Sequence, residues 1–148
     1  CYEFGKIEIL KQGKDISIVS YGSTLNLVID SIPEFEHLGI DVEIVDIQTL
    51  IPFDVGEEIL KSVRKTNRII IIDEDVPGGA SAYILHKLID EQKIFSYLDS
   101  PPKTLTAKEH RPSYGTDGDY FSKPSVDEIV ESVYQIMNES NPKRYPKL

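Results

Sequence analysis

Short apolar runs alternate with longer stretches of helical periodicity along most of the chain. Residues 16–20 and 42–47 have the composition of strands. Residues 69–72 are four isoleucines without polar alternation, which predicts a parallel strand that is buried on both faces. A shorter strand is predicted at 103–106, and residues 6–10 are expected to add an edge strand or a hairpin.

A helix is predicted after the first of these strands, with Ser23 or Thr24 as its N-cap. Gly39 is expected to close it in the left-handed conformation. Pro33 interrupts the pattern and predicts either a kink or two short helices that abut, with Pro33 near the start of the second. The expected apolar face consists of Leu25, Val28, Ile29, Ile32 and Phe35.

The next helix is expected to follow Pro52 and Phe53. Asp54 and Glu57 have the spacing of a capping box, in which one carboxylate binds free N–H groups and the other reaches back. Asn67 suits the C-terminal cap. The side chains expected to be buried are Val55, Ile59, Leu60 and Val63.

Two further helices complete the pattern. One is predicted over residues 80–92, and the last begins at a second capping box formed by Ser125 and Glu128. Strands that alternate with helices indicate βαβ units, so we predict an α/β fold with a mainly parallel sheet that is covered on both faces.

The length of 148 residues fits a single domain. We place its core at residues 6–137 and expect residues 138–148 to form an extended basic tail. Residues 107–124 lack periodicity and are rich in Gly, Pro, Asp and Ser, which predicts a long surface loop of the kind that often carries function. Because the first residue is Cys1 and not Met, we interpret the chain as a piece of a longer protein.

Composition narrows the classes of function. The net charge of −9 argues against general nucleic-acid binding but suits a basic protein partner. No apolar run approaches the ~20 residues that span a bilayer. Cys1 is the only cysteine, which excludes an internal disulfide and any paired-cysteine metal site. A single cysteine also fits a reducing compartment, and we expect a cytoplasmic protein.

The stretch DEDVPGG, residues 73–79, has the outline of a cofactor loop between a strand and a helix. Its glycines come five residues too late for a dinucleotide fingerprint, and no third glycine follows. The three acidic side chains would repel phosphate, and at most two of them would converge on a metal. We therefore interpret the stretch as an interface and as a tight entry into the helix. The residues concerned are Asp73, Glu74, Asp75, Gly78 and Gly79.

Two residues of the long loop, His110 and Arg111, complete the candidate interface. His37 and His86 fit solvated or partly packed side chains. No nucleophile elbow or triad signature is present. We therefore predict no catalytic residue, no cofactor-binding residue and no metal ligand in this chain.

Four segments in this order resemble a known family. They read GKIEILKQGKDISIVSYGS (5–23), GIDVEIVDIQTLIPFD (39–54), SVRKTNRIIIIDEDVPGGASAYI (62–84) and KPSVDEIVESV (123–133). They are similar to the C-terminal domain of the beta subunit of thiamine-diphosphate-dependent 2-oxo acid dehydrogenases, which is of the transketolase C-terminal type. The stretch TDGDYFSKPS (116–125) also resembles forms in which the alpha and beta subunits are fused.

The resemblance implies a three-layer αβα sandwich whose five-stranded, mostly parallel sheet has one antiparallel edge strand. It implies a parent enzyme that decarboxylates pyruvate or a branched-chain 2-oxo acid on thiamine diphosphate and Mg²⁺ and passes the acyl group to lipoamide. In that enzyme this domain packs the subunits into an oligomer and helps dock the dihydrolipoyl acyltransferase core. The cofactor lies between other domains.

The chain lacks the Gly-Asp-Gly and paired-asparagine motifs of a thiamine diphosphate site, so none of those residues carries over. We expect this fragment to be inactive and free of cofactor. Gln48 stands where many relatives have Arg. Two alternatives remain: a domain of transketolase or 1-deoxyxylulose-5-phosphate synthase, and a small-ligand or nucleotide module that uses the crevice at the strand carboxyl ends.

Overall fold

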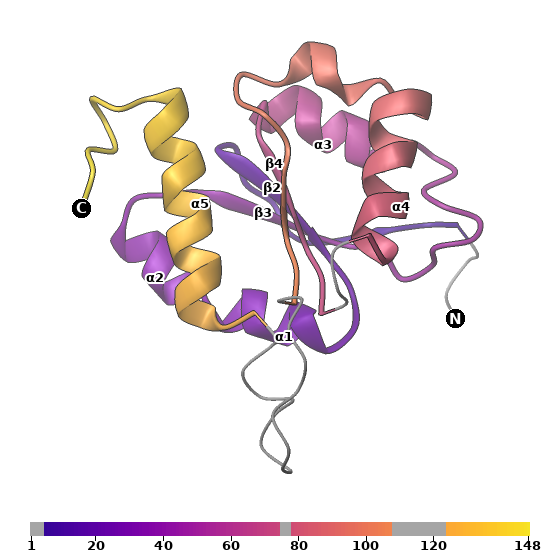
Figure 1. Cartoon of the computed structure of the whole chain (residues 1–148), viewed down its shortest axis with the longest axis horizontal. Helices are drawn as coiled ribbons and strands as arrows, with labels where there is room; N and C mark the ends of the chain where they lie inside the picture. The colour runs from indigo at the N-terminus through magenta and orange to yellow at the C-terminus, as the bar shows by residue number, and fades with distance from the viewer. Residues whose placement is uncertain (1–4, 75–77, 108–123) are drawn as a thin grey trace.

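The computed structural model describes residues 5–74, 78–107 and 124–148, which form one five-stranded sheet with helices on both faces (Figure 1). The elements in chain order are β1 (Glu8–Lys11), β2 (Ile16–Ser20), α1 (Gly22–Asp30), α2 (Ile32–His37), β3 (Val42–Asp46), α3 (Glu58–Thr66), β4 (Ile69–Ile72), α4 (Ala80–His86), a π-helical turn η1 (Lys87–Glu91), a 3₁₀ turn η2 (Ile94–Tyr97), β5 (Lys103–Leu105) and α5 (Val126–Ser140). Asp75, His110, Arg111 and nearly all of the predicted 107–124 loop lie outside the described residues.

The sheet has the strand order β1-β3-β2-β4-β5. The four strands β3, β2, β4 and β5 are parallel, and β1 pairs antiparallel with β3 at the edge. The predicted fold class is therefore confirmed, including the antiparallel edge strand.

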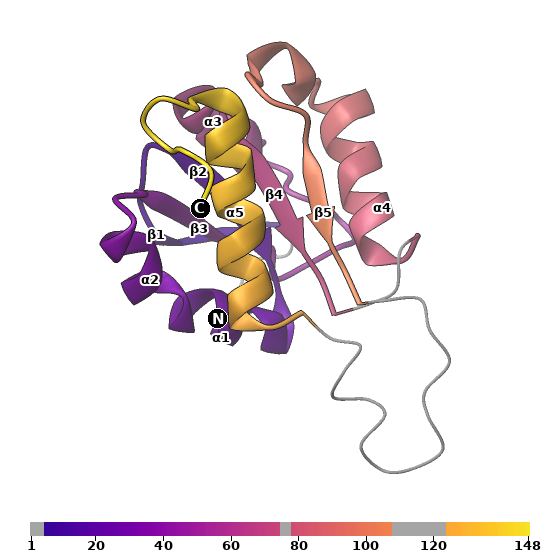
Figure 2. The same ribbon diagram turned by 60° about the vertical axis from the view of Figure 1, so that its left-hand side comes forward.

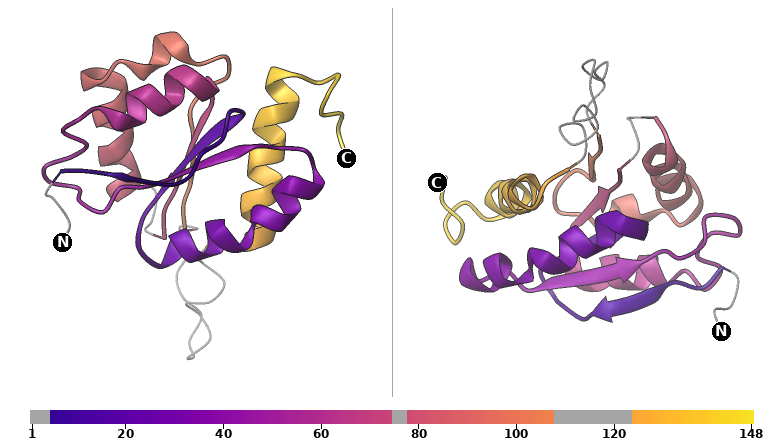
Figure 3. Two further views of the ribbon diagram at one scale, coloured as in Figure 1. Left: turned by 180° about the vertical axis from the view of Figure 1, so that it is seen from behind. Right: turned by 90° about the horizontal axis from the view of Figure 1, so that it is seen from below.

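The alternation of side chains along each strand divides the core in two. Ile18, Ile44 and Ile70 contribute to the cluster under α1, α2 and α5, whereas Val19 and Ile71 contribute to the cluster under α3 and α4. Figures 2 and 3 show these two helical layers on opposite faces of the sheet. All four isoleucines of β4 are at most 1% exposed, so the predicted burial of this strand on both faces is confirmed.

The first predicted helix consists of two short helices, α1 and α2. Of the two alternatives predicted at Pro33, a kink or two abutting helices, the second is confirmed. Pro33 lies in the first turn of α2, where its missing N–H leaves no bond unmade. The capping prediction is wrong, because α1 begins at Gly22 and its N-cap is Tyr21. Ser23 lies inside the helix and donates to Glu74 instead. Ile29 is 40% exposed and not part of the buried face.

Asp54 holds the start of α3. Its two carboxylate oxygens accept hydrogen bonds from the backbone N–H groups of Glu58 and Ile59, both at 2.9 Å. The predicted binding of free N–H groups by Asp54 is therefore confirmed. The predicted capping box is wrong, because Glu57 is the N-cap of α3 in a left-handed conformation and its side chain makes no capping hydrogen bond. Val55 was predicted to be buried, but it lies before the helix begins and is 66% exposed.

The predicted helix over 80–92 changes its geometry after His86. The backbone N–H of Gln92 donates to the carbonyl of Lys87 five residues earlier, which is the spacing of a π-helix. The 3₁₀ turn η2 that follows has no counterpart in the sequence-based prediction.

The last helix begins as predicted, with the Ser125 hydroxyl accepting from the backbone N–H of Glu128 at 3.2 Å. It continues to Ser140, so the prediction of an extended tail over 138–148 is wrong for residues 138–140. Beyond the helix the chain turns, and the backbone N–H of Tyr145 donates to the carbonyl of Asn141 at 3.0 Å. Tyr145 is 3% exposed and its ring meets that of Tyr134 edge to face. Burial raises the pKa of Tyr145, and the nearby charge of Asp15 adds to the effect. The tail therefore packs on α5.

No helix in the described ranges is both long and apolar enough to cross a membrane.

Candidate interface sites

Asp73 lies at the carboxyl end of β4, beside the end of β2. The chain leaves β2 and β4 toward opposite faces of the sheet, and such a point is where ligands of open α/β sheets bind. Asp73 is only 1% exposed. Its carboxylate accepts from the Tyr21 hydroxyl at 2.7 Å and from the backbone N–H of Ser81 at 3.1 Å. Asp73 thus joins the starts of α1 and α4.

The neighbouring residues show how the chain passes this point. Glu74 is exposed and accepts from the Ser23 hydroxyl at 2.8 Å. Gly78 has a φ of 90°, a conformation that side chains with Cβ rarely adopt, and Gly79 is the N-cap of α4. The φ of Gly78 fits the predicted turn into α4, but a Cβ atom on Gly78 would meet no atom of the described residues within 4 Å, so a close passage of the backbone at this glycine is not seen. The role of these residues as an interface stays a prediction.

This arrangement is poorly suited to an anionic ligand. Two hydrogen bonds, from Tyr21 to Asp73 and from Ser23 to Glu74, bridge the crevice between β2 and β4. Both accepting groups are carboxyl groups, which repel phosphate when they are ionised. The nucleotide-module alternative therefore gains no support from the described part of this crevice.

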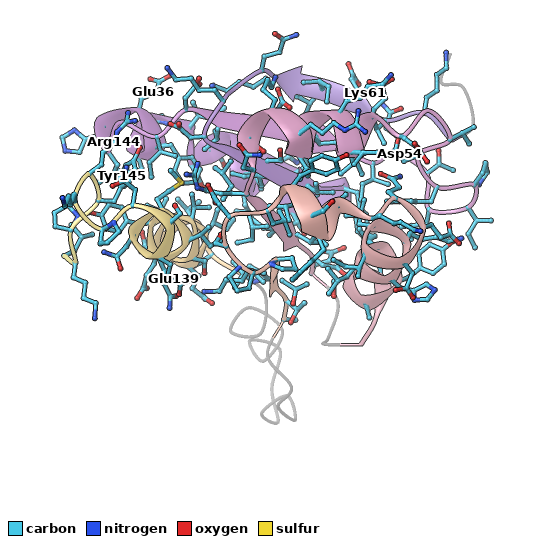
Figure 4. The ribbon with its side chains drawn as sticks, turned by 90° about the horizontal axis from the view of Figure 1, so that it is seen from above. Glu36, Asp54, Lys61, Glu139, Arg144 and Tyr145 are labelled. Carbon is cyan, nitrogen blue, oxygen red and sulfur yellow. The ribbon has the colours of Figure 1, made fainter. Side chains whose placement is uncertain are left out.

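A groove of about 720 Å³ lies on the other side of the molecule, between α2, α5 and the tail. Its apolar floor includes Leu38, Val130 and Tyr134. The acidic residues that line it are Glu34, Asp127, Glu131 and Glu139, and its basic residue is Lys147. Figure 4 shows Glu139 on one side of α5 and Arg144 and Tyr145 of the tail on the other side, toward Glu36. An apolar floor between acidic walls suits a basic amphipathic segment.

A buried polar network fixes α3 to the sheet. Glu43, the second residue of β3, is 2% exposed and accepts from the backbone N–H of Gly13 at 3.2 Å, from the Ser62 hydroxyl and from the Lys65 ammonium group. Ser17 lies 2.6 Å from the Ser62 hydroxyl. Ser17 and Ser62 are enclosed between helix and sheet, so a substrate cannot reach these hydroxyl groups. The sequence prediction missed this network, although a charged residue within an apolar strand was its signal.

Gln48 joins two acidic side chains at the edge of the sheet. Its amide donates to Glu8 at 2.9 Å and its backbone N–H donates to Asp46 at 3.1 Å. Burial raises the pKa of Asp46, the bond from Gln48 opposes this rise, and the charge of Glu8 on the paired strand adds to it. Among the described residues, no group of three or more His, Cys, Asp or Glu side chains is placed to hold a metal ion.

The fold and these sites define an α/β domain whose buried carboxyl groups hold its elements together. The sequence profile of the family "Transketolase, C-terminal domain" matches residues 5–127. The chain belongs to this family. The predicted resemblance is thereby confirmed.

The curated relatives are beta subunits. The chain is 33% identical over 129 residues to the pyruvate dehydrogenase E1 component subunit beta of Rhizobium meliloti, covering 87% of this chain and 28% of that protein. It is 35% identical over 132 residues to the same subunit of Mesostigma viride, covering 89% and 40%. It is 33% identical over 138 residues to the acetoin:2,6-dichlorophenolindophenol oxidoreductase subunit beta of Bacillus subtilis, covering 91% and 39%.

Solved structures agree on the fold. A split-gene transketolase, described as an inactive beta4 tetramer, matches with a TM-score of 0.72 at 22% identity over 93% of this chain and 44% of that one. A transketolase variant of Pichia stipitis matches with a TM-score of 0.63 at 16% identity, over 94% and 19%.

The chain spans about 28–40% of the length of the first curated relatives that it matches. One relative, from Arabidopsis thaliana, is named as mitochondrial, so the cytoplasmic location of this chain stays a prediction.

Proposed function

We propose that this chain is the C-terminal domain of the beta part of a 2-oxo acid dehydrogenase, where it serves assembly and docking and not catalysis. The main support for this proposal is how much of this chain, and how much of each relative, the matches span. The beta-subunit relatives match 87–90% of this chain but only 28–40% of their own length, so the larger remaining part is available for the catalytic machinery. The parent enzyme then decarboxylates pyruvate or a branched-chain 2-oxo acid.

The cofactors of that reaction belong, on this proposal, to other domains. Thiamine diphosphate and Mg²⁺ supply the decarboxylation chemistry in the parent enzyme. The residues of this chain do not fit a diphosphate group: the motifs of such a site are absent from the sequence, and Asp73 and Glu74 bridge the crevice that a phosphate would enter. The partners are the alpha part and a further copy of the beta part.

Docking of the acyltransferase core is assigned to the groove between α2 and α5. Its acidic walls and apolar floor complement a basic subunit-binding domain, and charges of opposite sign steer two proteins together. The net charge of −9 acts in the same direction over longer distances.

The test compares three preparations: residues 1–148 alone, the full gene product with its alpha part, and the full product lacking this domain. Each is supplied with thiamine diphosphate, Mg²⁺, an artificial electron acceptor, and either pyruvate or a branched-chain 2-oxo acid. We expect turnover by the complete assembly only, and loss of the assembled oligomer when the domain is removed. Thiamine-dependent turnover by residues 1–148 alone would contradict the proposal.

Acetoin is a second candidate substrate for the parent enzyme. It is favoured by the Bacillus subtilis relative, whose match covers 91% of this chain. The same assay should therefore also include acetoin as a substrate. Faster turnover of acetoin than of either 2-oxo acid would identify acetoin as the preferred substrate of the parent enzyme. The transketolase alternative rests on likenesses of 15–22% identity, which concern the fold alone.

A further inference from the structure

The loop between β3 and α3 presents apolar side chains to solvent. Ile51 is 78% exposed and Val55 is 66% exposed, and Pro52 between them is also exposed. We call these three residues the 51–55 patch. Isolated exposed apolar residues are common, so exposure alone does not make this patch a contact surface. The packing of the loop and the residues beside the patch have to be considered as well.

The same loop is anchored on its inner side. Leu50 and Phe53 pack against the core cluster under α3 and α4, and the ring of Phe53 meets that of Tyr83 edge to face at 6.4 Å. Asp54 caps α3 and also accepts from the side-chain amide of Gln92 at 3.0 Å. The loop therefore fixes Ile51 and Val55 in outward positions.

The backbone of the loop carries strain. Three of its residues other than glycine have left-handed φ angles: Gln48 at 63°, Asp54 at 37° and Glu57 at 52°. Such conformations persist only where surrounding contacts hold the backbone in place. Here those contacts are the packing of Leu50 and Phe53 and the hydrogen bonds of Asp54.

The chain enters the domain at this patch. The carbonyl of Gly5 accepts from the backbone N–H of Val55 at 2.8 Å. A Cβ atom on Gly5 would lie 2.4 Å from Val55 Cγ2 and 3.1 Å from Pro52 Cγ, so the bare backbone of Gly5 lies flat against both residues. Figures 1 and 3 show the first described residues, which lead into β1, on the side of the molecule away from the C-terminal end.

We propose that the 51–55 patch is the contact surface for the domain that precedes residue 5 in the parent chain. This inference rests on the proposed function, because a parent chain longer than these 148 residues is part of it. A domain that precedes residue 1 is joined to Gly5 by only four residues. Because Gly5 contacts Val55, the effective concentration of that domain at the patch is high. The surface that it meets is aliphatic and uncharged, so the facing surface of the preceding domain is apolar.

The experiment uses the double variant Ile51→Asp/Val55→Asp in two settings, the 148-residue chain and the full-length gene product. The matched control is Phe95→Asp, because Phe95 is also 66% exposed but lies on η2. In the 148-residue chain we expect both variants to unfold within about 2 °C of the wild type, since exposed positions contribute little to stability.

In the full-length product the two variants should differ. The double variant should split thermal unfolding into two separate transitions, because domains that have lost their contact unfold independently. It should also speed proteolytic cleavage of the junction before Gly5 by about tenfold, because the junction is then more accessible. The control should do neither. If the double variant and the control behave alike in the full-length product, the proposal is wrong.

Two further outcomes are decisive. If the 148-residue chain forms a dimer in sedimentation measurements and the double variant abolishes it, the patch joins copies of this chain and the proposal is overturned. Asp at position 55 could lower the stability of the 148-residue chain itself. In that case the double variant Ile51→Ser/Val55→Thr is used, because Thr keeps the shape beside Gly5. The same split of thermal unfolding into two transitions is expected for it in the full-length product. None of these readouts depends on turnover, so they stand apart from the test of the catalytic assignment.

Discussion

Individual carboxyl groups in this domain act as structural connectors. Asp73 joins α1 to α4, Asp54 joins α3 to η1 through Gln92, and Glu43 joins β3 to α3. A buried carboxyl group is tolerated when its oxygens accept hydrogen bonds. Of these three residues only Asp73 was a candidate site residue from the sequence, and in the structure it holds two helices together.

Asp46 allows a test at the level of one residue. Its pKa is raised above 3.8, chiefly by burial, so the stability it contributes is present at low pH and is lost as pH rises through its folded pKa. Asp46→Asn removes that loss and keeps an oxygen for the N–H of Gln48. We expect the variant to raise the midpoint of thermal unfolding at pH 7 by about 1–2 °C.

The pH dependence of this difference provides the control. As pH falls below 3.8, the ordinary pKa of an Asp side chain, both side chains become neutral and the advantage of the variant should shrink. Calorimetry at pH 3.5 and pH 7 checks the expectation, and an equal difference at both pH values would show that the charge of Asp46 is not its cause.

At the scale of elements, the tail and α5 form one packing unit. Tyr145 is buried, its ring meets Tyr134, and the tail carbonyl of Pro146 accepts from the Tyr134 hydroxyl. The side-chain amide of Asn138 donates to the carbonyl of Tyr145 at 2.7 Å. The residues after Ser140 thereby cover part of the core under α5.

Removing the Tyr145 ring should therefore destabilise the domain. We expect Tyr145→Ala to lower the free energy of unfolding by about 3 kcal/mol, as for other large buried aromatic side chains. Tyr145→Phe keeps the ring and loses only the hydroxyl contact to the Gly39 carbonyl at 3.4 Å, so it should change stability little. Urea unfolding of both variants provides the measurement, and equal losses for Ala and Phe would assign the stabilisation to the hydroxyl group.

Elements governed by local pattern could be predicted from the sequence, and those governed by distant contacts could not. Four adjacent isoleucines fix β4, and Pro33 fixes the break between α1 and α2. The candidate interface residue Asp73 was found from its position after β4. Its burial depends on Tyr21, which is 52 residues away, and no local signal carries that information. The packing of Tyr145 against Gly39, 106 residues away, escaped prediction for the same reason.

At the scale of the whole molecule, two surfaces lie far apart. The 51–55 patch adjoins the N-terminal entry, whereas the acidic groove lies on α2, α5 and the tail near the opposite end (Figure 1). One domain can thus contact its own parent chain and a separate partner at the same time.

The acidic groove should bind its basic partner in a salt-dependent manner. We expect the affinity of this chain for the subunit-binding domain of an acyltransferase to fall by about tenfold between 50 and 500 mM salt, because salt screens exposed charges. Asp127→Asn/Glu131→Gln should weaken binding at low salt by about three- to tenfold. Glu57→Gln is the control, since this exposed residue precedes α3 outside the groove. Titration calorimetry is suitable, and salt-independent binding would refute the electrostatic account.

The network around Glu43 also constrains how this domain can change over evolutionary time. Its hydrogen bonds connect the backbone at Gly13 with side chains on β2, β3 and α3. Replacing one member leaves a buried polar group without its partner, at a cost of about 1–3 kcal/mol. Replacing all of the members together by apolar groups need not carry this cost. Substitutions at Ser17, Glu43 and Ser62 are therefore epistatic, and lineages should either keep these residues together or exchange them together.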